Sequence, residues 1–203
     1  MILAVLASDA QKEEIAKADY FQKHEIVFSE NVSLWTNHIA DGFMDLTFSP
    51  DPKRINLLMR LAPKPVFVGA VTETLDELDP SFIRINVWPG FLKGKYLEAA
   101  AGEEARTKAV NIFGDQILFV KDTPGFVSAR IVAMVINEAY FTLDSGTGSK
   151  EEIDIAMKLG TAYPFGPFEW AELIGTDRII SLLEKLGESN PLYEIAPGLK
   201  KGK

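Results

Sequence analysis

KDTPGFVSAR (residues 121–130) and LGTAYPFGPFEWAELIG (residues 159–175) are the two stretches that decide the fold. In the first, Pro124 has a fixed φ and Gly125 accepts almost any φ, a combination typical of a turn before a helix. From residue 127 to 143 apolar side chains then recur at about every fourth position, which is the period of an amphipathic helix. We therefore predict that the chain changes its kind of structure at this turn.

Beyond the turn the signals are helical. Ser149 and Glu152 form an S-x-x-E capping box, which predicts a helix from there to Leu159. Further helices are expected at residues 168–174 and 177–186, and we expect the tail LKKGK (199–203) to be frayed. Residues 123–203 are thus predicted to form an all-helical C-terminal domain.

Before the turn, segments typical of strands alternate with segments typical of helices. PVFVGA (65–70) is apolar throughout, as expected of a strand that is covered on both faces. The pattern predicts strands at 1–7, 24–29, 43–48, 65–70, 82–88 and 117–121, and helices at 8–20, 32–40, 51–61 and 103–113. Such alternation favours a mostly parallel α/β sheet over residues 1–122.

Composition excludes several classes of protein. The formal net charge of −8 argues against a nucleic-acid or anionic-membrane binder, because both need a basic face. The chain has no cysteine and two histidines, His24 and His38, so we expect no disulfide and no metal site. The apolar run MILAVLA ends at Ser8, too soon for a membrane span, and we expect a cytoplasmic protein.

A sheet that begins at the first residue invites a test for dinucleotide binding. That function needs glycines after the first strand, so that the backbone can approach a pyrophosphate at a helix N-terminus. Here residues 7–12 read ASDAQK, without a glycine. Ser8 and Gln11 form an S-x-x-Q capping box, and Asp9 places a negative charge in the first turn. We therefore expect no cofactor-binding residues here and no NAD binding of the usual kind.

Several segments resemble the 3-hydroxyacyl-CoA dehydrogenase family. GFMDLTFSPDPKRINLLMRLAPKPVFVGA (42–70), RINVWPGFLKGKYLEAA (84–100) and KDTPGF (121–126) resemble successive parts of that family. EEIDIAMKLGTAYPFGPFEWAELIG (151–175) is similar to its motif D-x-A-M-x-x-G-x-x-x-P-x-G-P-F-x-x-x-D-x-x-G, with Glu172 in place of the later aspartate. The resemblance covers about residues 42–200, and the first 41 weakly.

The resemblance implies a shortened Rossmann-like sheet followed by the family's helical domain. In the family, that second domain forms the dimer interface and one wall of the acyl-CoA cleft. It also implies NAD as cofactor, a role in fatty acid metabolism, and a homodimer through the C-terminal helices.

The family's catalytic dyad aligns with a changed pair in this chain. A histidine leads its motif H-F-F-N-P and a glutamate follows twelve positions later, which corresponds here to Asn86 and Glu98. A histidine can take the proton of a 3-hydroxyl near neutral pH, whereas asparagine cannot. Loss of a general base costs roughly 10²–10⁴-fold in rate. Glu98 is then either a remaining base or a carboxylate at the surface or at a helix start.

Three other positions bear on a ligand. Lys93 and Lys95 flank a glycine and are candidates for contact with a CoA phosphate, or are simply solvated. Within the family's V-N-R, Ala129 stands where an asparagine faces the active site, while Arg130 is retained and is read as a structural ion pair or cap.

Two hypotheses follow. The first is a folded, dimeric family member without ordinary dehydrogenase activity, which acts as a binding or regulatory homologue for an acyl-CoA-like ligand or a related chain. The second is an active NAD-dependent oxidoreductase of the family, with altered catalytic residues.

Overall fold

The computed structural model describes residues 1–37 and 39–201. The chain divides into two compact units, Met1–Phe126 and Val127–Lys203, whereas the sequence placed the boundary after residue 122. Within the described residues, no helix has the length and apolar character to cross a bilayer.

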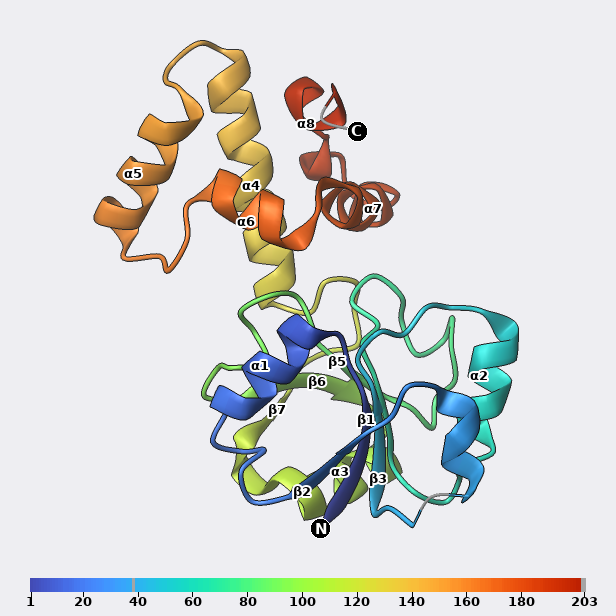
Figure 1. Ribbon diagram of the computed structural model, residues 1–203. Coiled ribbons are helices and arrows are strands. Elements are labelled where there is room, and N and C mark those ends of the chain that lie inside the picture. The colour runs from blue at the N-terminus through green and yellow to red at the C-terminus, as the bar shows by residue number, and fades with distance from the viewer. Residues whose placement is uncertain (38, 202–203) are drawn as a thin grey trace. The chain divides into compact units, whose positions relative to one another are not determined.

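The first unit is an α/β sheet, and the fold class predicted from the sequence is confirmed (Figure 1). The seven strands lie in the order β2-β1-β3-β4-β5-β6-β7, and every neighbouring pair is parallel except the antiparallel pair β5–β6. The elements are β1 (Ile2–Leu6), α1 (Asp9–Lys17), β2 (Glu25–Phe28), η1 (Val32–Asn37), β3 (Gly42–Asp45), α2 (Pro52–Met59), β4 (Val66–Val68), β5 (Ile83–Ile85), β6 (Leu97–Ala101), α3 (Glu103–Phe113), η2 (Gly114–Gln116) and β7 (Ile117–Phe119).

Three local predictions were wrong. The sequence analysis missed β6, whose sequence LEAAA has low strand propensity and forms a strand through pairing with β5 and β7. The helix predicted at 32–40 is the 3₁₀ helix η1, which ends at Asn37, and residue 38 lies outside the described residues. Helix α1 ends at Lys17 rather than near residue 20, because Ala18 is already extended.

Alternate side chains of the strands face two different layers. On one face Ala4, Phe43 and Val68 belong to a buried core with Trp35 from η1 and Leu58 from α2. The rings of Trp35 and Phe43 lie 5.4 Å apart. This period-two pattern assigns η1 and α2 to one side of the sheet, where Figure 1 shows α2.

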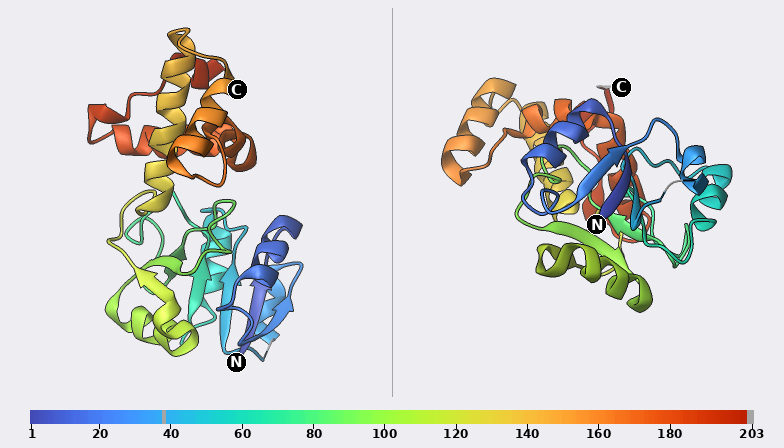
Figure 2. Two further views of the ribbon diagram at one scale, coloured as in Figure 1. Left: turned by 90° about the vertical axis from the view of Figure 1, so that its left-hand side faces the viewer. Right: turned by 60° about the horizontal axis from the view of Figure 1, so that its bottom comes forward.

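The other face is covered by α3 and the segment after α1. Phe113 of α3 packs edge-on against Phe67 of β4, with the ring centroids 5.4 Å apart. Tyr20 and Phe21 meet the same Phe113 ring at 6.0 and 5.7 Å. The left panel of Figure 2 looks onto this face, with α1 and α3 in front of the strands.

A buried cation joins the end of β4, β5 and the segment that leaves the unit. Arg84 of β5 is 0% exposed, and its Nε and Nη2 donate to the carbonyl oxygens of Ala70 and Val71, both at 3.1 Å. Its Nη1 is paired with Asp122, and its guanidinium lies 4.6 Å from the centre of the Phe126 ring. Burial lowers the pKa of Arg84, and Asp122 opposes that shift.

This contact explains the motif KDTPGF in physical terms. Asp122 accepts from the amide of Leu75 at 2.8 Å as well as from Arg84. Gly125 has φ of 77° and donates its amide to Val71 at 2.8 Å, so the chain turns back where a side chain would be strained. Asp122 and Phe126 of the motif therefore contact Arg84 directly. Gly125 donates to the carbonyl oxygen of Val71, which also accepts from Arg84.

The second unit is helical throughout, as predicted. Helix α4 packs against α6, α7 and α8, whereas α5 packs against α6 (Figure 1). The elements are α4 (Ser128–Asp144), α5 (Lys150–Thr161), α6 (Pro167–Ile174), α7 (Thr176–Gly187), η3 (Pro191–Tyr193) and α8 (Pro197–Lys201). The capping box at Ser149 and Glu152 is confirmed.

The prediction of a frayed tail was wrong as far as residue 201. Helix α8 ends at Lys201, and its Leu199 is 0% exposed. Two side chains of α4 hold this segment by its backbone. Asn137 donates to the carbonyl oxygen of Glu194 at 2.8 Å and accepts from the amide of Ala196 at 2.9 Å. The carboxylate of Asp144 accepts from the amide of Gly198 at 2.7 Å.

The long motif over 151–175 is built around Asp154. This carboxylate is buried and accepts from the first amides of α6, Phe168 N at 2.8 Å and Glu169 N at 3.3 Å. It lies so close to Gly166 that a Cβ there would overlap it. Pro167 occupies the first turn of α6, where no amide is needed. The spacing D-x₁₁-G-P-F therefore describes a helix cap that one helix supplies to another.

We predict that Asp122→Ala destabilises the α/β unit by about 3 kcal/mol, because it leaves the guanidinium of Arg84 buried without its counterion. Urea unfolding followed by circular dichroism measures the loss. Asp115→Ala, at an exposed acid of the same unit, should change stability by less than about 0.5 kcal/mol. Equal stability of the two variants would contradict the role assigned to the ion pair.

We predict that Ala162→Gly stabilises the helical unit. Ala162 ends α5 in the left-handed conformation, with φ of 55° and ψ of 30°, where glycine avoids the steric cost of a Cβ. The expected gain is about 0.5 kcal/mol in thermal unfolding, after the greater chain entropy of glycine is subtracted. Ala156→Gly within the same helix should instead cost about 1 kcal/mol. A loss of stability in both variants would refute the prediction.

Candidate functional site

Strand pairing brings the two dyad positions together. The antiparallel register of β5 and β6 sets Ile85 opposite Ala99, so the next pair along the strands is Asn86 opposite Glu98. The amide of Asn86 donates to the carbonyl oxygen of Glu98 at 3.0 Å. Their side chains meet as well, with Asn86 Nδ2 3.1 Å from Glu98 Oε2. The twelve-residue spacing is thus the length of a loop whose two ends face each other.

The side chain of Asn86 is fixed in one orientation. It is 1% exposed, and its Oδ1 accepts from the amide of Trp88 at 3.1 Å, which directs Nδ2 toward the carboxylate of Glu98. Because Glu98 lies in β6, the alternative that it begins a helix was wrong. The pair can donate a hydrogen bond and hold a negative charge, but Asn86 cannot accept a proton. Catalysis by either residue stays a prediction.

Lys93 and Lys95 lie in the loop between β5 and β6, which begins at Asn86 and ends at Tyr96. Both lysines are exposed, and Lys95 Nζ lies 5.3 Å from the centre of the Tyr96 ring. This loop therefore carries Asn86 and both lysines, and Glu98 lies in β6 directly after it. Contact of the lysines with a ligand stays a prediction.

The carboxyl ends of β1 and β3 form the switch point of the sheet, where α/β folds of this kind bind nucleotides. The predicted capping box is present there. Gln11 N donates to Ser8 Oγ at 3.3 Å, and Ser8 N donates to Gln11 Oε1 at 2.9 Å. Asp9 pairs with Lys12 at 2.9 Å. The first amides of α1 are therefore partly used by the helix itself.

Two further contacts join α1 and α2 to the end of β3. Gln11 Nε2 donates to the carbonyl oxygen of Leu46 at 2.9 Å. The fully buried Asp45 accepts from Arg54 Nε at 2.6 Å and from Arg54 Nη2 at 2.5 Å. Burial raises the pKa of Asp45, and the Arg54 guanidinium counteracts this shift. These residues do not match the glycine cradle that a pyrophosphate needs. The sequence analysis missed this ion pair, although a charged residue inside an apolar strand signals a buried partner.

No group of three or more His, Cys, Asp or Glu side chains that could hold a metal ion occurs among residues 1–37 and 39–201.

The positions near the start of α4 are also placed by the structure. Ala129 is 0% exposed in the first turn of α4. The guanidinium of Arg130 lies 5.9 Å from the centre of the Tyr193 ring, within the helical unit. A buried alanine offers no polar atom to a ligand.

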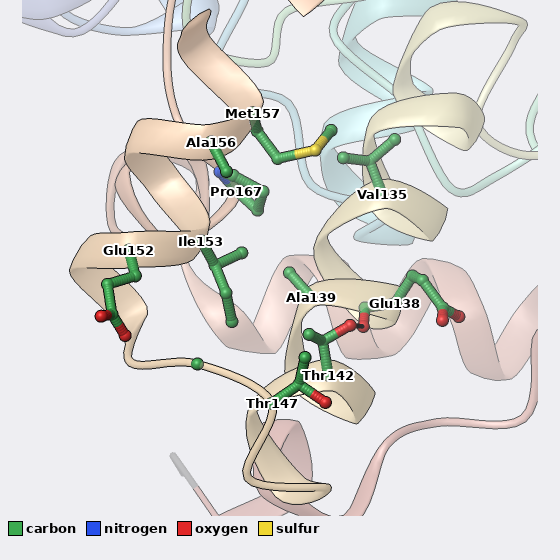
Figure 3. Close-up of a pocket in the computed structure, with 11 residues that line it drawn as sticks. Val135, Glu138, Ala139, Thr142, Thr147, Glu152, Ile153, Ala156, Met157 and Pro167 are labelled. Atoms are coloured by element: carbon green, nitrogen blue, oxygen red, sulfur yellow. Dashed lines mark hydrogen bonds between the residues drawn. The ribbon is translucent and has the colours of Figure 1, made fainter. Parts of the chain in front are cut away.

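An apolar groove lies between α4 and α5 in the helical unit. It has a volume of about 550 Å³, and Figure 3 shows its walls, with Val135 and Ala139 on α4 facing Ile153 and Met157 on α5. The remaining lining residues are Glu138, Thr142, Thr147, Gly148, Glu152, Ala156 and Pro167. The sequence analysis missed this groove, because the helical period alone does not tell which apolar face lacks a partner.

Comparison with known proteins points to one family. The family model described as 3-hydroxyacyl-CoA dehydrogenase, C-terminal domain, matches residues 125–200. The chain is 40% identical over 102 residues to the 3-hydroxyadipyl-CoA dehydrogenase of Escherichia coli (strain K12), which is 47% of this chain and 22% of that protein. It is 42% identical over 84 residues to the mitochondrial hydroxyacyl-coenzyme A dehydrogenase of Homo sapiens, which is 40% of this chain and 27% of that protein.

A solved structure extends the likeness to the fold of both units. The crystal structure of the (S)-3-hydroxybutyryl-CoA dehydrogenase from Ralstonia eutropha matches with a TM-score of 0.71 and 19% identity, over 98% of this chain and 92% of that chain. The sequence matches span only 22% and 27% of the length of the two curated relatives. Residues 125–200 therefore match the C-terminal domain of the 3-hydroxyacyl-CoA dehydrogenase family, and the solved structure shows the same fold over both units.

Proposed function

We propose that this protein has lost the NAD-dependent dehydrogenase activity of its family and acts as a binding or regulatory homologue. The observation that carries the proposal is the pair of Asn86 and Glu98, whose side chains are 3.1 Å apart and which the sequence resemblance aligns with the family's dyad. The geometry of a dyad is present, but its basic member is an amide. Oxidation of a 3-hydroxyl needs an acceptor for the hydroxyl proton while hydride leaves, and Asn86 cannot be that acceptor.

The switch point supports the same proposal. A pyrophosphate binds to free amides at a helix N-terminus, helped by the positive end of the helix dipole. Here Ser8 caps the helix, Asp9 supplies the negative charge, and Gln11 reaches Leu46. A nucleotide would have to displace these contacts and approach a carboxylate. We therefore propose that NAD does not bind in the usual manner.

The proposed ligand is an acyl-CoA-like molecule. The amide of Asn86 is a neutral donor that suits the carbonyl oxygen of a thioester or a 3-keto group. The exposed Lys93 and Lys95, on the same loop, suit the phosphates of the CoA moiety. A neutral donor at one end of the ligand and cations at the other favour binding without turnover.

A titration with NADH and a set of CoA esters tests this function. We expect no enhancement of NADH fluorescence at micromolar protein and no reduction of acetoacetyl-CoA, while acetoacetyl-CoA alone raises the melting temperature. Micromolar NADH binding or measurable reduction would refute the loss of activity. Lys200→Ala, outside the loop, serves as a matched control for Lys93→Ala, which should weaken binding of the CoA ester.

A second candidate is an active NAD-dependent oxidoreductase with altered catalytic residues. It is favoured by Glu98, a carboxylate that is retained beside the substituted position and can accept a proton itself. In that case Glu98→Gln abolishes the reduction of acetoacetyl-CoA. If the wild type is inactive, Asn86→His tells which defect causes this, since it restores activity only if cofactor binding is intact.

We also propose that the chain forms a homodimer through its C-terminal helices. The apolar groove between α4 and α5 supports this, as do two apolar side chains of α5, Ile155 and Leu159, which are 54% and 83% exposed. An apolar groove and exposed apolar side chains of this kind are typical of interaction sites. A second copy of the same helices offers a matching apolar surface.

We predict that Met157→Glu, which places a charge in the groove, shifts the protein from dimer to monomer in analytical ultracentrifugation. Leu192→Glu is the control, because Leu192 is 75% exposed in η3 and does not line the groove. The control should remain dimeric. A wild-type protein that sediments as a monomer at micromolar concentration would contradict the proposed dimer.

A further inference from the structure

Two residues in and just after α1 form hydrogen bonds to the backbone of the loop between β5 and β6. Glu14 of α1 accepts a hydrogen bond from the amide of Gly90, with Oε1 2.7 Å from the nitrogen. The hydroxyl of Tyr20 donates to the carbonyl oxygen of Leu92. Tyr20 and Leu92 are 1% and 0% exposed, so this second contact is shielded from water. Two bonds from one short segment thus hold the middle of the loop.

The backbone hydrogen bonds between Trp88 and Gly94 form short-range turns. Phe91 N donates to Trp88 O at 3.1 Å, and Gly94 N donates to Phe91 O at 3.2 Å. Gly90 has φ of 93°, which turns the backbone there. Such turns shape the loop but do not orient it with respect to the sheet, so the bonds from Glu14 and Tyr20 have that role.

Glu14 is an unusual residue to find at this place. Its Oε2 is buried and has no hydrogen-bond partner within the described part of the chain. A buried carboxylate oxygen without a partner is costly, so the bond of Oε1 to Gly90 has to compensate for it. The neighbouring Glu13 is exposed and lies 4.0 Å from Lys17, as surface acids commonly do. The two adjacent acids of α1 therefore have different roles.

Tyr20 lies near the same carboxylate. Burial raises the pKa of Tyr20, and the charge of Glu14 raises it further. The phenol is protonated at neutral pH in any case, so its bond to Leu92 is a second contact with the loop beside that of Glu14.

We propose that Glu14 is a positioning residue: through Gly90, and with Tyr20, it orients the 88–95 loop and so sets Lys93 and Lys95 in a fixed place relative to Asn86 and Glu98. The role in ligand binding rests on the proposed function, whereas the role in holding the loop does not. Helix α1 begins without the glycines that a pyrophosphate needs. In this proposal it instead holds the loop between β5 and β6 in place.

Limited trypsin digestion of the full chain tests the proposal, with cleavage after Lys93 and Lys95 followed by mass spectrometry. We expect Glu14→Ala to be cleaved there at least several-fold faster than wild type. Glu13→Ala is the matched control and should be cleaved at the wild-type rate. Glu14→Gln keeps the Oε1 acceptor and should also digest slowly, a rescue that a general loss of stability would not show.

Affinity for acetoacetyl-CoA gives the second measurement. Glu14→Ala should weaken it about tenfold, because the loop with the two lysines is no longer held by the Glu14–Gly90 bond, and Glu13→Ala should leave it unchanged. If Glu14→Ala does not fold, Tyr20→Phe removes the other bond and should accelerate the same cleavages. Wild-type cleavage rates in Glu14→Ala, or in Tyr20→Phe in its place, would overturn the positioning role. Absence of acetoacetyl-CoA binding in wild type would refute the proposed function and leave the digestion result to decide on Glu14.

Discussion

The buried guanidinium of Arg84 is the constraint on which the α/β unit depends. A cation at 0% exposure is tolerated only when its hydrogen bonds and its charge are matched. Here the guanidinium donates to two carbonyl oxygens after β4 and pairs with Asp122, which follows β7. The ring of Phe126 lies over the cation. Segments far apart in the sequence meet at one side chain. Asn86 follows two positions later, directly after β5, so the interaction that stabilises the fold also fixes the end of the strand where the candidate site lies.

The antiparallel pairing of β5 and β6 then defines what the site can do. It sets Asn86 against Glu98 through both backbone and side chains, and the amide is oriented by Trp88. A histidine in this geometry could accept a proton while the carboxylate stabilised its charge. An asparagine keeps the hydrogen bond and its direction but carries no proton between substrate and solvent. Under the proposed function, an asparagine at this position would separate recognition of a carbonyl group from the chemistry of a hydroxyl group.

Local signals in the sequence predicted the structure well where the stabilising contacts are themselves local. The capping boxes at Ser8 and Ser149 are examples, since both partners lie within one helical turn. Strand β6 was missed because LEAAA has little strand propensity of its own, and its conformation comes from its neighbours in the sheet. The helix at the C-terminus was missed because Asn137 and Asp144, more than fifty positions away, hold its backbone. The bond of Glu14 to Gly90 spans a similar separation and leaves no pattern in either segment.

The matched and the changed positions of the family motifs differ in the physical demand placed on them. Asp154 caps α6 through a space that only a glycine at position 166 leaves free, and Gly125 adopts a φ that strains other residues. Few residue types satisfy such backbone requirements, so a chain that keeps the fold keeps these residues. Position 86 and residues 7–12 carry no such backbone requirement, and there an amide or a capped helix is compatible with the same backbone. The family model matches residues 125–200. This region includes Gly125, Asp154 and Gly166, but neither position 86 nor residues 7–12. Similarity in that region is therefore evidence for the architecture, and the activity has to be judged from the Asn86–Glu98 pair and the switch point.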